Sequence, residues 1–187
     1  MANYISGAPL WAIVLFIPLF LYSIFFITGP VQQAALKAGL TSGRARNIRL
    51  GIISFYIIYL AYASVLALKG LLDVNSLPPR VMVWAGIPLI VILFGLAGNT
   101  RLFKRILQAI TLESLIRIHI FRLLGVFFII LYGYRLLPAR FAFFAGLGDI
   151  ITAIFALPVA WMVAARKPGW KTALYAWNIF GIMDVID

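Results

Sequence analysis

The 187-residue sequence contains no cysteine, a single histidine and few charged residues, and each shortage excludes a class of protein. Without cysteine the chain forms no disulfide and no thiolate metal or iron–sulfur site. One histidine, His119, excludes a haem held by two histidines of the same chain. Only 11% of the residues are charged and 64% are hydrophobic, against about 25% charged in an ordinary soluble domain. So apolar a chain is expected in a lipid bilayer.

The sequence also lacks the recurring motifs of enzymes. It has no phosphate-binding glycine loop, no G-x-S-x-G nucleophile motif and no pair of metal ligands. It therefore predicts neither an enzyme nor a cofactor or metal ion. The net charge of +11 is common in nucleic-acid-binding proteins, but in this chain we expect the basic residues to orient helices and to contact anionic lipids, with no nucleic-acid partner.

Long apolar runs are the main feature that is present. A helix needs about 20 mostly apolar residues to cross a bilayer. The runs predict spans at about residues 8–29, 50–68, 81–98, 117–136, 141–164 and 171–187. We therefore expect an all-α membrane protein, a single transmembrane domain over residues 1–187 with about six spans. The last run is barely long enough, so either its end lies at the outer interface or the natural protein continues beyond Asp187.

Basic residues alternate between the predicted loops. The loops after the first, third and fifth spans, with the adjoining helix ends, contain 12 lysines and arginines, and the other two loops contain four. Cytoplasmic loops of membrane proteins are enriched in these residues, so the N-terminus is predicted outside. The loop that begins TRLFKRILQAI has basic and apolar residues on opposite helical faces. We expect it to form a helix in the cytoplasmic headgroup layer.

One ten-residue phrase occurs twice: residues 77–86 read LPPRVMVWAG and residues 137–146 read LPARFAFFAG. Both lie at predicted outer turns, where proline suits the first turn of the next helix. The preceding helices share an arginine, then a glycine, then an aromatic-rich run. The pattern predicts a parallel repeat of helical hairpins, residues 49–98 and 122–164, as in some transporter folds. Independent use of the same turn chemistry is the alternative.

Two aspartates lie inside predicted spans, Asp149 on the fifth and Asp184 at a similar depth on the sixth. An aspartate at the middle of a spanning helix costs about 2.5–3.5 kcal/mol, so both should face the bundle. Two carboxylates in a low dielectric would share a proton or a cation, and Arg135 and Arg140 near the outer turn could neutralise one of them. The alternative is an ion pair or hydrogen bond that only locks helices together.

A second polar group is predicted nearer the cytoplasm. His119 and Arg122 are three residues apart on one face of the fourth span, and Asn178 of the sixth span could meet them. Arg122 lies one to two turns inside the predicted span, so it must reach the interface or pair. His119 is expected to be either an interfacial hydrogen-bonding residue or part of a proton relay.

The segment HIFRLLGVFF, with LPARFAFFAGLGDIITAIFALPVAW and WNIFGIMD after it, resembles a group of small bacterial multi-pass membrane proteins with an LPxxFAxxAGxGD pattern. The resemblance covers about residues 117–184 and includes Arg122, Gly125 and Asp149. It implies a location in the bacterial inner membrane and implies no activity.

Two functions stay open from the sequence. One is a small transporter or channel for a proton, a cation or another solute, with Asp149 and Asp184 in its site. The other is a non-catalytic membrane subunit or scaffold, whose buried charges lock helices or meet a partner, either a second copy of the chain or another membrane protein.

Overall fold

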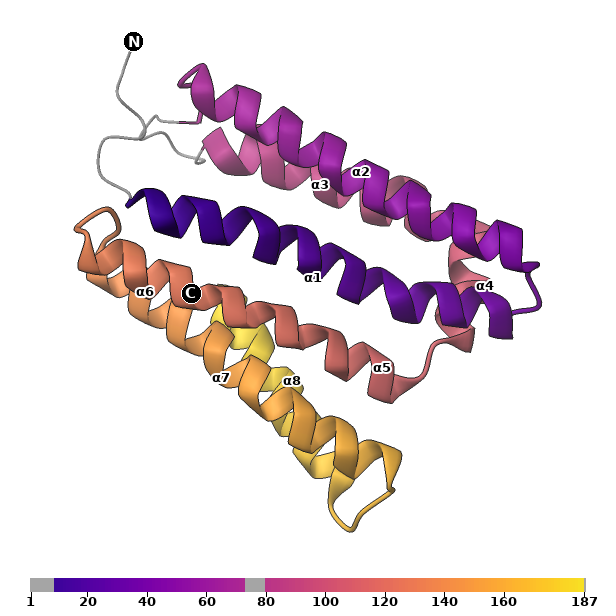
Figure 1. The fold of residues 1–187 in the computed structure, drawn as a ribbon. Coiled ribbons are helices and arrows are strands. Elements are labelled where there is room, and N and C mark those ends of the chain that lie inside the picture. The colour runs from indigo at the N-terminus through magenta and orange to yellow at the C-terminus, as the bar shows by residue number, and fades with distance from the viewer. Residues whose placement is uncertain (1–8, 73–79, 187) are drawn as a thin grey trace. The chain divides into compact units, whose positions relative to one another are not determined.

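The computed structural model describes residues 9–72 and 80–186, and every regular element in these ranges is a helix (Figure 1). In chain order they are α1 (Leu10–Lys37), α2 (Ser42–Leu68), α3 (Ile87–Ile90), α4 (Arg101–Ala109), α5 (Leu112–Arg117), α6 (Val126–Gly133), α7 (Ala139–Ala164) and α8 (Trp170–Ile186). The predicted all-α class is confirmed.

Two longer helices combine several of these elements. The helix Met82–Asn99 consists of α3 with π-helical turns on both sides, Met82–Gly86 and Val91–Leu96, and a final 3₁₀ turn. The helix Leu112–Gly133 consists of α5 and α6 joined by a 3₁₀ segment, Ile118–Gly125. Such a long 3₁₀ stretch is uncommon and often marks a hinge or a local constraint.

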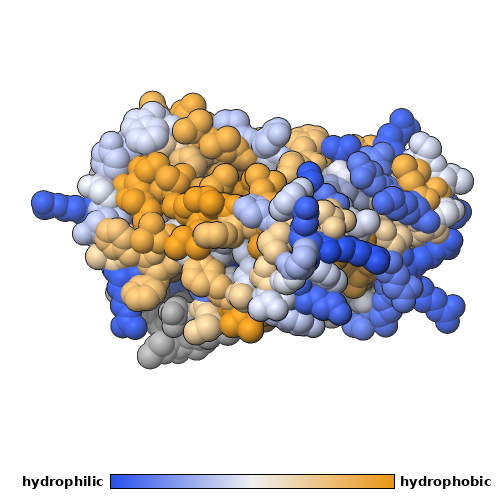
Figure 2. Space-filling view, turned by 90° about the horizontal axis from the view of Figure 1, so that it is seen from below, coloured by the Kyte–Doolittle hydropathy of each residue, from blue (hydrophilic) through white to orange (hydrophobic). Residues whose placement is uncertain are grey.

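Five helices of the described chain are long and apolar enough to cross a membrane: Leu10–Lys37, Ser42–Leu68, Met82–Asn99, Leu112–Gly133 and Ala139–Ala164. Many of their large apolar side chains are exposed, and Figure 2 shows broad apolar areas on one face. Contiguous apolar surface of this kind is rare on soluble monomers, so the helices are compatible with a membrane protein. α8 has 17 residues and is not among the five.

Several helices continue past the apolar runs that predict the spans. α1 extends from the predicted end at about residue 29 to Lys37, through the segment QQAALK, whose residue types favour a helix. The helix that contains the run predicted from about residue 117 starts at Leu112. The Thr111 side chain caps it by accepting a hydrogen bond from the Ser114 N–H, 3.2 Å away.

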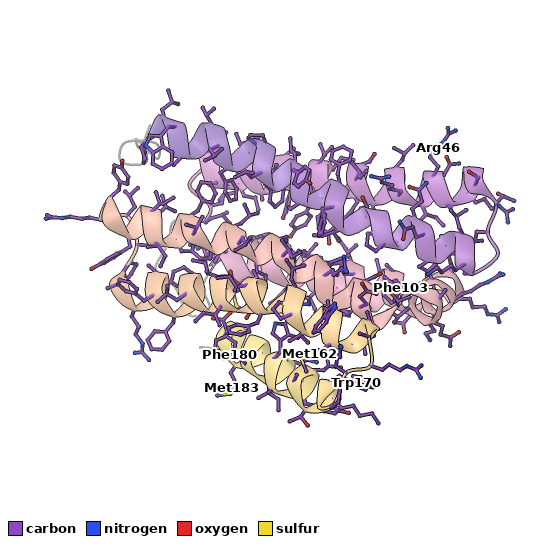
Figure 3. The ribbon with its side chains drawn as sticks, turned by 60° about the horizontal axis from the view of Figure 1, so that its bottom comes forward. Arg46, Phe103, Met162, Trp170, Phe180 and Met183 are labelled. Carbon is purple, nitrogen blue, oxygen red and sulfur yellow. The ribbon has the colours of Figure 1, made fainter. Side chains whose placement is uncertain are left out.

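The described chain divides into two compact units, residues 28–110 and residues 9–27 with 111–186. In the first unit the end of α1 packs against the start of α2 and against α4. The buried residues of this cluster are Ala34, Ala35, Ala45 and Ile106. Arg49 of α2 donates a hydrogen bond of 3.0 Å to Gln32 of α1. α4 confirms a helix in the amphipathic loop, and Figure 3 labels its Phe103.

The two predicted hairpins differ in backbone form. In the first, the hydroxyls of Tyr59 and Tyr62 donate to the backbone carbonyls of Ala85 and Trp84 in the π-helical turn. In the second, α7 is an α-helix throughout. Most of the first turn, residues 73–79, lies outside the described residues, and the parallel repeat stays a prediction.

In the second unit, α7 packs its small residues against the helix Leu112–Gly133 and against α8. The buried residues of α7 are Ala142, Gly146, Gly148, Thr152, Ala153, Ala156, Val159 and Ala160. Small residues let two helix backbones approach closely in a membrane. At the closest approach, a Cβ on Gly125 would lie 2.5 Å from the Asp149 Cβ and 3.0 Å from the Gly146 carbonyl oxygen.

We predict that Gly125→Ala destabilises the fold by about 1–3 kcal/mol, because the added methyl group forces the two helices apart. Thermal unfolding in detergent measures the effect. Gly133→Ala is the matched control, because a Cβ at Gly133, on the same helix, meets nothing within 4 Å. Equal melting temperatures for the two variants would contradict the close packing.

Candidate functional site

The side chain of Arg122 binds two carboxylates on two other helices. Its Nε donates to Oδ1 of Asp149 on α7, and its Nη2 donates to Oδ2 of Asp184 on α8. Its Nη1 donates to the carbonyl oxygen of Gly181, 3.3 Å away. The three charged side chains, called the charged cluster below, are 9%, 22% and 6% exposed in the order Arg122, Asp149, Asp184. One guanidinium thus joins three helices.

The position of Arg122 follows from the earlier helix start. Counted from Leu112, it lies about 17 Å along its helix, at about 1.5 Å per residue in α5 and about 2.0 Å per residue in the 3₁₀ segment. Asp149 lies about 15 Å from the start of α7. The 3₁₀ segment has three residues per turn, so His119, Arg122 and Gly125 share one face. That face is turned toward α7.

Three glycines make room for the charged cluster. A Cβ on Gly148 would overlap the Asp184 carboxylate, so α7 leaves its space to a side chain of α8. A Cβ on Gly181 would lie 3.2 Å from the Arg122 Nη1, and Gly125 faces Asp149 in the same way. Glycine at these three positions therefore allows buried charges to fit between closely packed helices.

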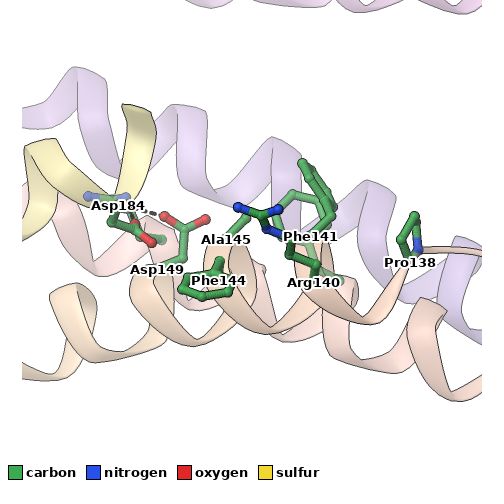
Figure 4. Close-up of a pocket in the computed structure, with 9 residues that line it drawn as sticks. Pro138, Arg140, Phe141, Phe144, Ala145, Asp149 and Asp184 are labelled. Carbon is green, nitrogen blue, oxygen red and sulfur yellow. Dashed lines mark hydrogen bonds and ion pairs between the residues drawn. The ribbon is translucent and has the colours of Figure 1, made fainter. Parts of the chain in front are cut away.

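A cavity of about 680 Å³ opens beside the charged cluster on the side of the α6–α7 turn; we call it the first cavity (Figure 4). Its lining residues are Arg122, Phe128, Pro138, Arg140, Phe141, Phe144, Ala145, Asp149 and Asp184. In Figure 4 the Arg140 guanidinium points along this cavity toward Asp149. Asp149 is the most exposed member of the cluster and faces the opening.

Arg135 and Arg140, which the sequence analysis placed near the carboxylates, take different positions. Arg140 lines the first cavity. Arg135 lies in the turn between α6 and α7 with φ of 59°, and it is exposed. Among the ion pairs of the described residues, those of Asp149 and Asp184 are made by Arg122.

The polar group predicted nearer the cytoplasm is connected to the two aspartates, because Arg122 belongs to both. His119 and Asn178 line another cavity with Arg122, on the opposite side of the charged cluster from the first; we call it the second cavity. The sequence analysis treated the carboxylates and the His119 group as separate because it measured depth from about residue 117, five residues after the helix begins. It also missed Thr152, a buried polar residue three positions after Asp149 that lines the second cavity.

The cluster does not have the composition of a metal centre. Within the described ranges, no three His, Cys, Asp or Glu side chains lie close enough together to hold a metal ion. A guanidinium occupies the place between the two carboxylates.

Comparison with known proteins identifies a family. A family model described as a domain of unknown function, DUF8737, matches residues 78–187, which is more than half of the chain. The chain belongs to the DUF8737 family. No curated protein and no solved structure matches it. The part that matches DUF8737 contains the charged cluster and both cavities.

We predict that Arg122→Gln destabilises the protein by about 3–5 kcal/mol, because it leaves two buried carboxylates without their cation. Adding Asp149→Asn and Asp184→Asn should recover part of this loss, since the uncompensated charges are then gone. Unfolding in detergent gives the three stabilities.

Arg117→Gln is the control on the same helix. Arg117 pairs with Glu113 at 2.7 Å, but their side chains are 52% and 33% exposed. Its loss should cost at most about 1 kcal/mol. A triple variant no more stable than Arg122→Gln would show that unpaired charge is not the cause of the destabilisation.

Proposed function

We propose that this chain is a non-enzymatic membrane protein that binds and exchanges a proton or a small monovalent cation at Asp149 and Asp184. The observation that carries the proposal is the composition of the cluster, one arginine with two aspartates. Two carboxyl groups share one guanidinium, so ionisation of both would place two negative charges beside one positive charge among apolar helices. The excess negative charge would be costly in a low dielectric, and a proton or a cation would neutralise it.

The first cavity supports exchange with water. Asp149 is 22% exposed and lines the cavity, so a proton or a hydrated cation has a way in. Arg140 lines the same cavity, where its positive charge can lower the local proton or cation concentration and tune Asp149. A buried ionisable residue that faces a cavity is the common form of ion and proton sites in membrane proteins.

The proposed topology has six spans, with α8 as the sixth and the N-terminus outside. The alternation of basic loops supports this orientation. In it the α6–α7 turn and the opening of the first cavity face outward, and α4, which carries Arg101, Lys104 and Arg105, lies on anionic lipid at the cytoplasmic face of a bacterial inner membrane. The predicted hairpin repeat would be the frame of a small transporter.

A second candidate function is a scaffold or subunit whose charged cluster locks three helices. The tight fit of Gly148 against Asp184 favours it, since a lock needs fixed geometry. A groove of about 470 Å³ between α7 and α8 also ends at Asp184. Its lining includes Phe180 and Met183, which project from α8 in Figure 3, and a partner helix or a second copy could pack there.

We predict that the protein reconstituted in liposomes carries a proton or monovalent-cation flux, and that Asp149→Asn lowers it at least about tenfold. The neutral amide keeps the shape of the side chain but can neither release a proton nor balance a cation. A pH-sensitive dye and a potassium- or sodium-sensitive dye measure the two fluxes separately.

Glu113→Gln is the control, because Glu113 lies on the partly exposed face of α5 and outside both cavities. Folded wild-type protein without flux, combined with an Asp149→Asn variant that only melts at a lower temperature, would rule out simple ion conduction and favour the scaffold.

A further inference from the structure

The second cavity lies across the charged cluster from the first. Its volume is about 260 Å³, and its lining residues are His119, Arg122, Thr152, Trp177, Asn178, Gly181 and Ile182. Arg122 lines both cavities. The cluster is therefore the wall between them.

The order of residues along three helices supports this arrangement. On Leu112–Gly133, Phe128 of the first cavity and His119 of the second lie on opposite sides of Arg122. On α7, the residues of the first cavity precede or include Asp149, whereas Thr152 follows it. On α8, all four residues that line the second cavity precede Asp184. Since α7 runs antiparallel to the other two helices, the two cavities lie toward opposite ends of the bundle.

Two buried polar atoms belong to residues that line the second cavity and make no hydrogen bond with any residue that the structure describes. They are Oγ1 of Thr152, whose residue is 1% exposed, and Nδ1 of His119. Leaving such an atom unpaired costs about 1–3 kcal/mol. Water that enters a cavity can supply such bonds to the polar groups of its wall, and 260 Å³ is room for several molecules at about 30 Å³ each.

The wall around these atoms is fixed by other contacts. The Trp177 Nε1 donates to the Thr152 carbonyl oxygen at 2.9 Å. The same indole stands edge-on to the His119 ring, with the ring centroids 5.0 Å apart. The Thr152 hydroxyl and the His119 Nδ1 are thus held in place without using their own hydrogen-bonding capacity.

We infer that the second cavity is a water-filled access path to the charged cluster from the membrane side opposite to the first cavity. It takes water and, with it, protons or small hydrated cations, through hydrogen bonds of His119, Thr152 and Asn178. The inference rests on the proposed ion exchange for its purpose. The cluster is then reached by water from both sides, and Arg122 separates the two paths.

The absence of cysteine makes the test direct, because each variant carries a single thiol. Asn178→Cys reports the second cavity and Ala145→Cys the first. A charged, membrane-impermeant thiosulfonate is added to right-side-out and to inverted vesicles. The reagent attacks the thiolate, which forms in water and is suppressed in an apolar environment.

We predict that Ala145→Cys reacts from one side and Asn178→Cys from the other. Ile154→Cys on α7 and Ile179→Cys on α8 are the controls, since these exposed side chains lie outside both cavities and should react from neither side. Thr152→Cys replaces Asn178→Cys if the latter does not fold. A thiol of the second cavity that reacts from the same side as Ala145→Cys, or from neither side, overturns the inference.

Flux measurements on the same preparations separate this inference from the proposed function. Thr152→Val keeps the shape of the side chain and removes the hydroxyl. Its flux should be severalfold lower than that of the wild type. If the wild-type protein carries a flux that Thr152→Val leaves unchanged, and the thiol at residue 178 does not react, the second path is ruled out while the proposed ion exchange stands. If the thiols at residues 145 and 178 react from opposite sides but the wild-type protein carries no flux, the two paths are supported and the proposed ion exchange is ruled out.

Discussion

The packing of the second unit depends on the hydrogen bonds and ion pairs that the guanidinium of Arg122 makes. The guanidinium is planar and carries five N–H donors in a fixed geometry, and three of its nitrogens here donate to acceptors on α7 and α8. A lysine ammonium could not reach the two carboxylates and the Gly181 carbonyl from one position with the same geometry. The glycines at 125, 148 and 181 follow from this requirement, because a side chain at any of them would collide with a member of the charged cluster or press against one.

The sequence predicts the helical class and the approximate place of the helices, because apolar runs of sufficient length can form little else in a bilayer. It also identifies Asp149 and Asp184, since charges in such runs are costly. The sequence does not identify Arg122 as the partner of these aspartates in the same way. The first turns of the helix Leu112–Gly133, LESLIR, are partly polar, so hydropathy starts the apolar run about five residues after the helix begins and places Arg122 only one to two turns inside it. The 3₁₀ segment that aligns Arg122 with His119 and Gly125 leaves no mark in the apolar pattern.

The difference between the two hairpins has a physical reason in the sequence. Where the second has Gly148 and Asp149, the first has Pro88 and Leu89. Pro88 has no N–H to donate to the Trp84 carbonyl four residues earlier, and the Tyr62 hydroxyl bonds that carbonyl instead, at 2.9 Å. The backbone before the proline takes π-helical form, and tyrosines tie it to α2. The same stretch thus serves packing in the first hairpin and carries the buried charge in the second.

The 3₁₀ segment links the charge of the cluster to the backbone. Side chains turn by about 120° per residue in a 3₁₀-helix and by about 100° in an α-helix. A change of Ile118–Gly125 to α-helix would therefore rotate Arg122 by about 60° relative to His119, away from one of its carboxylates. A proton or cation on a carboxylate weakens its bond to Arg122 and so favours that rotation, since a ligand shifts an equilibrium by its difference in affinity for the two forms. A helix lock would gain nothing from this coupling, whereas the proposed exchange, with water on both sides of Arg122, needs a step that loosens the bonds between Arg122 and its carboxylates.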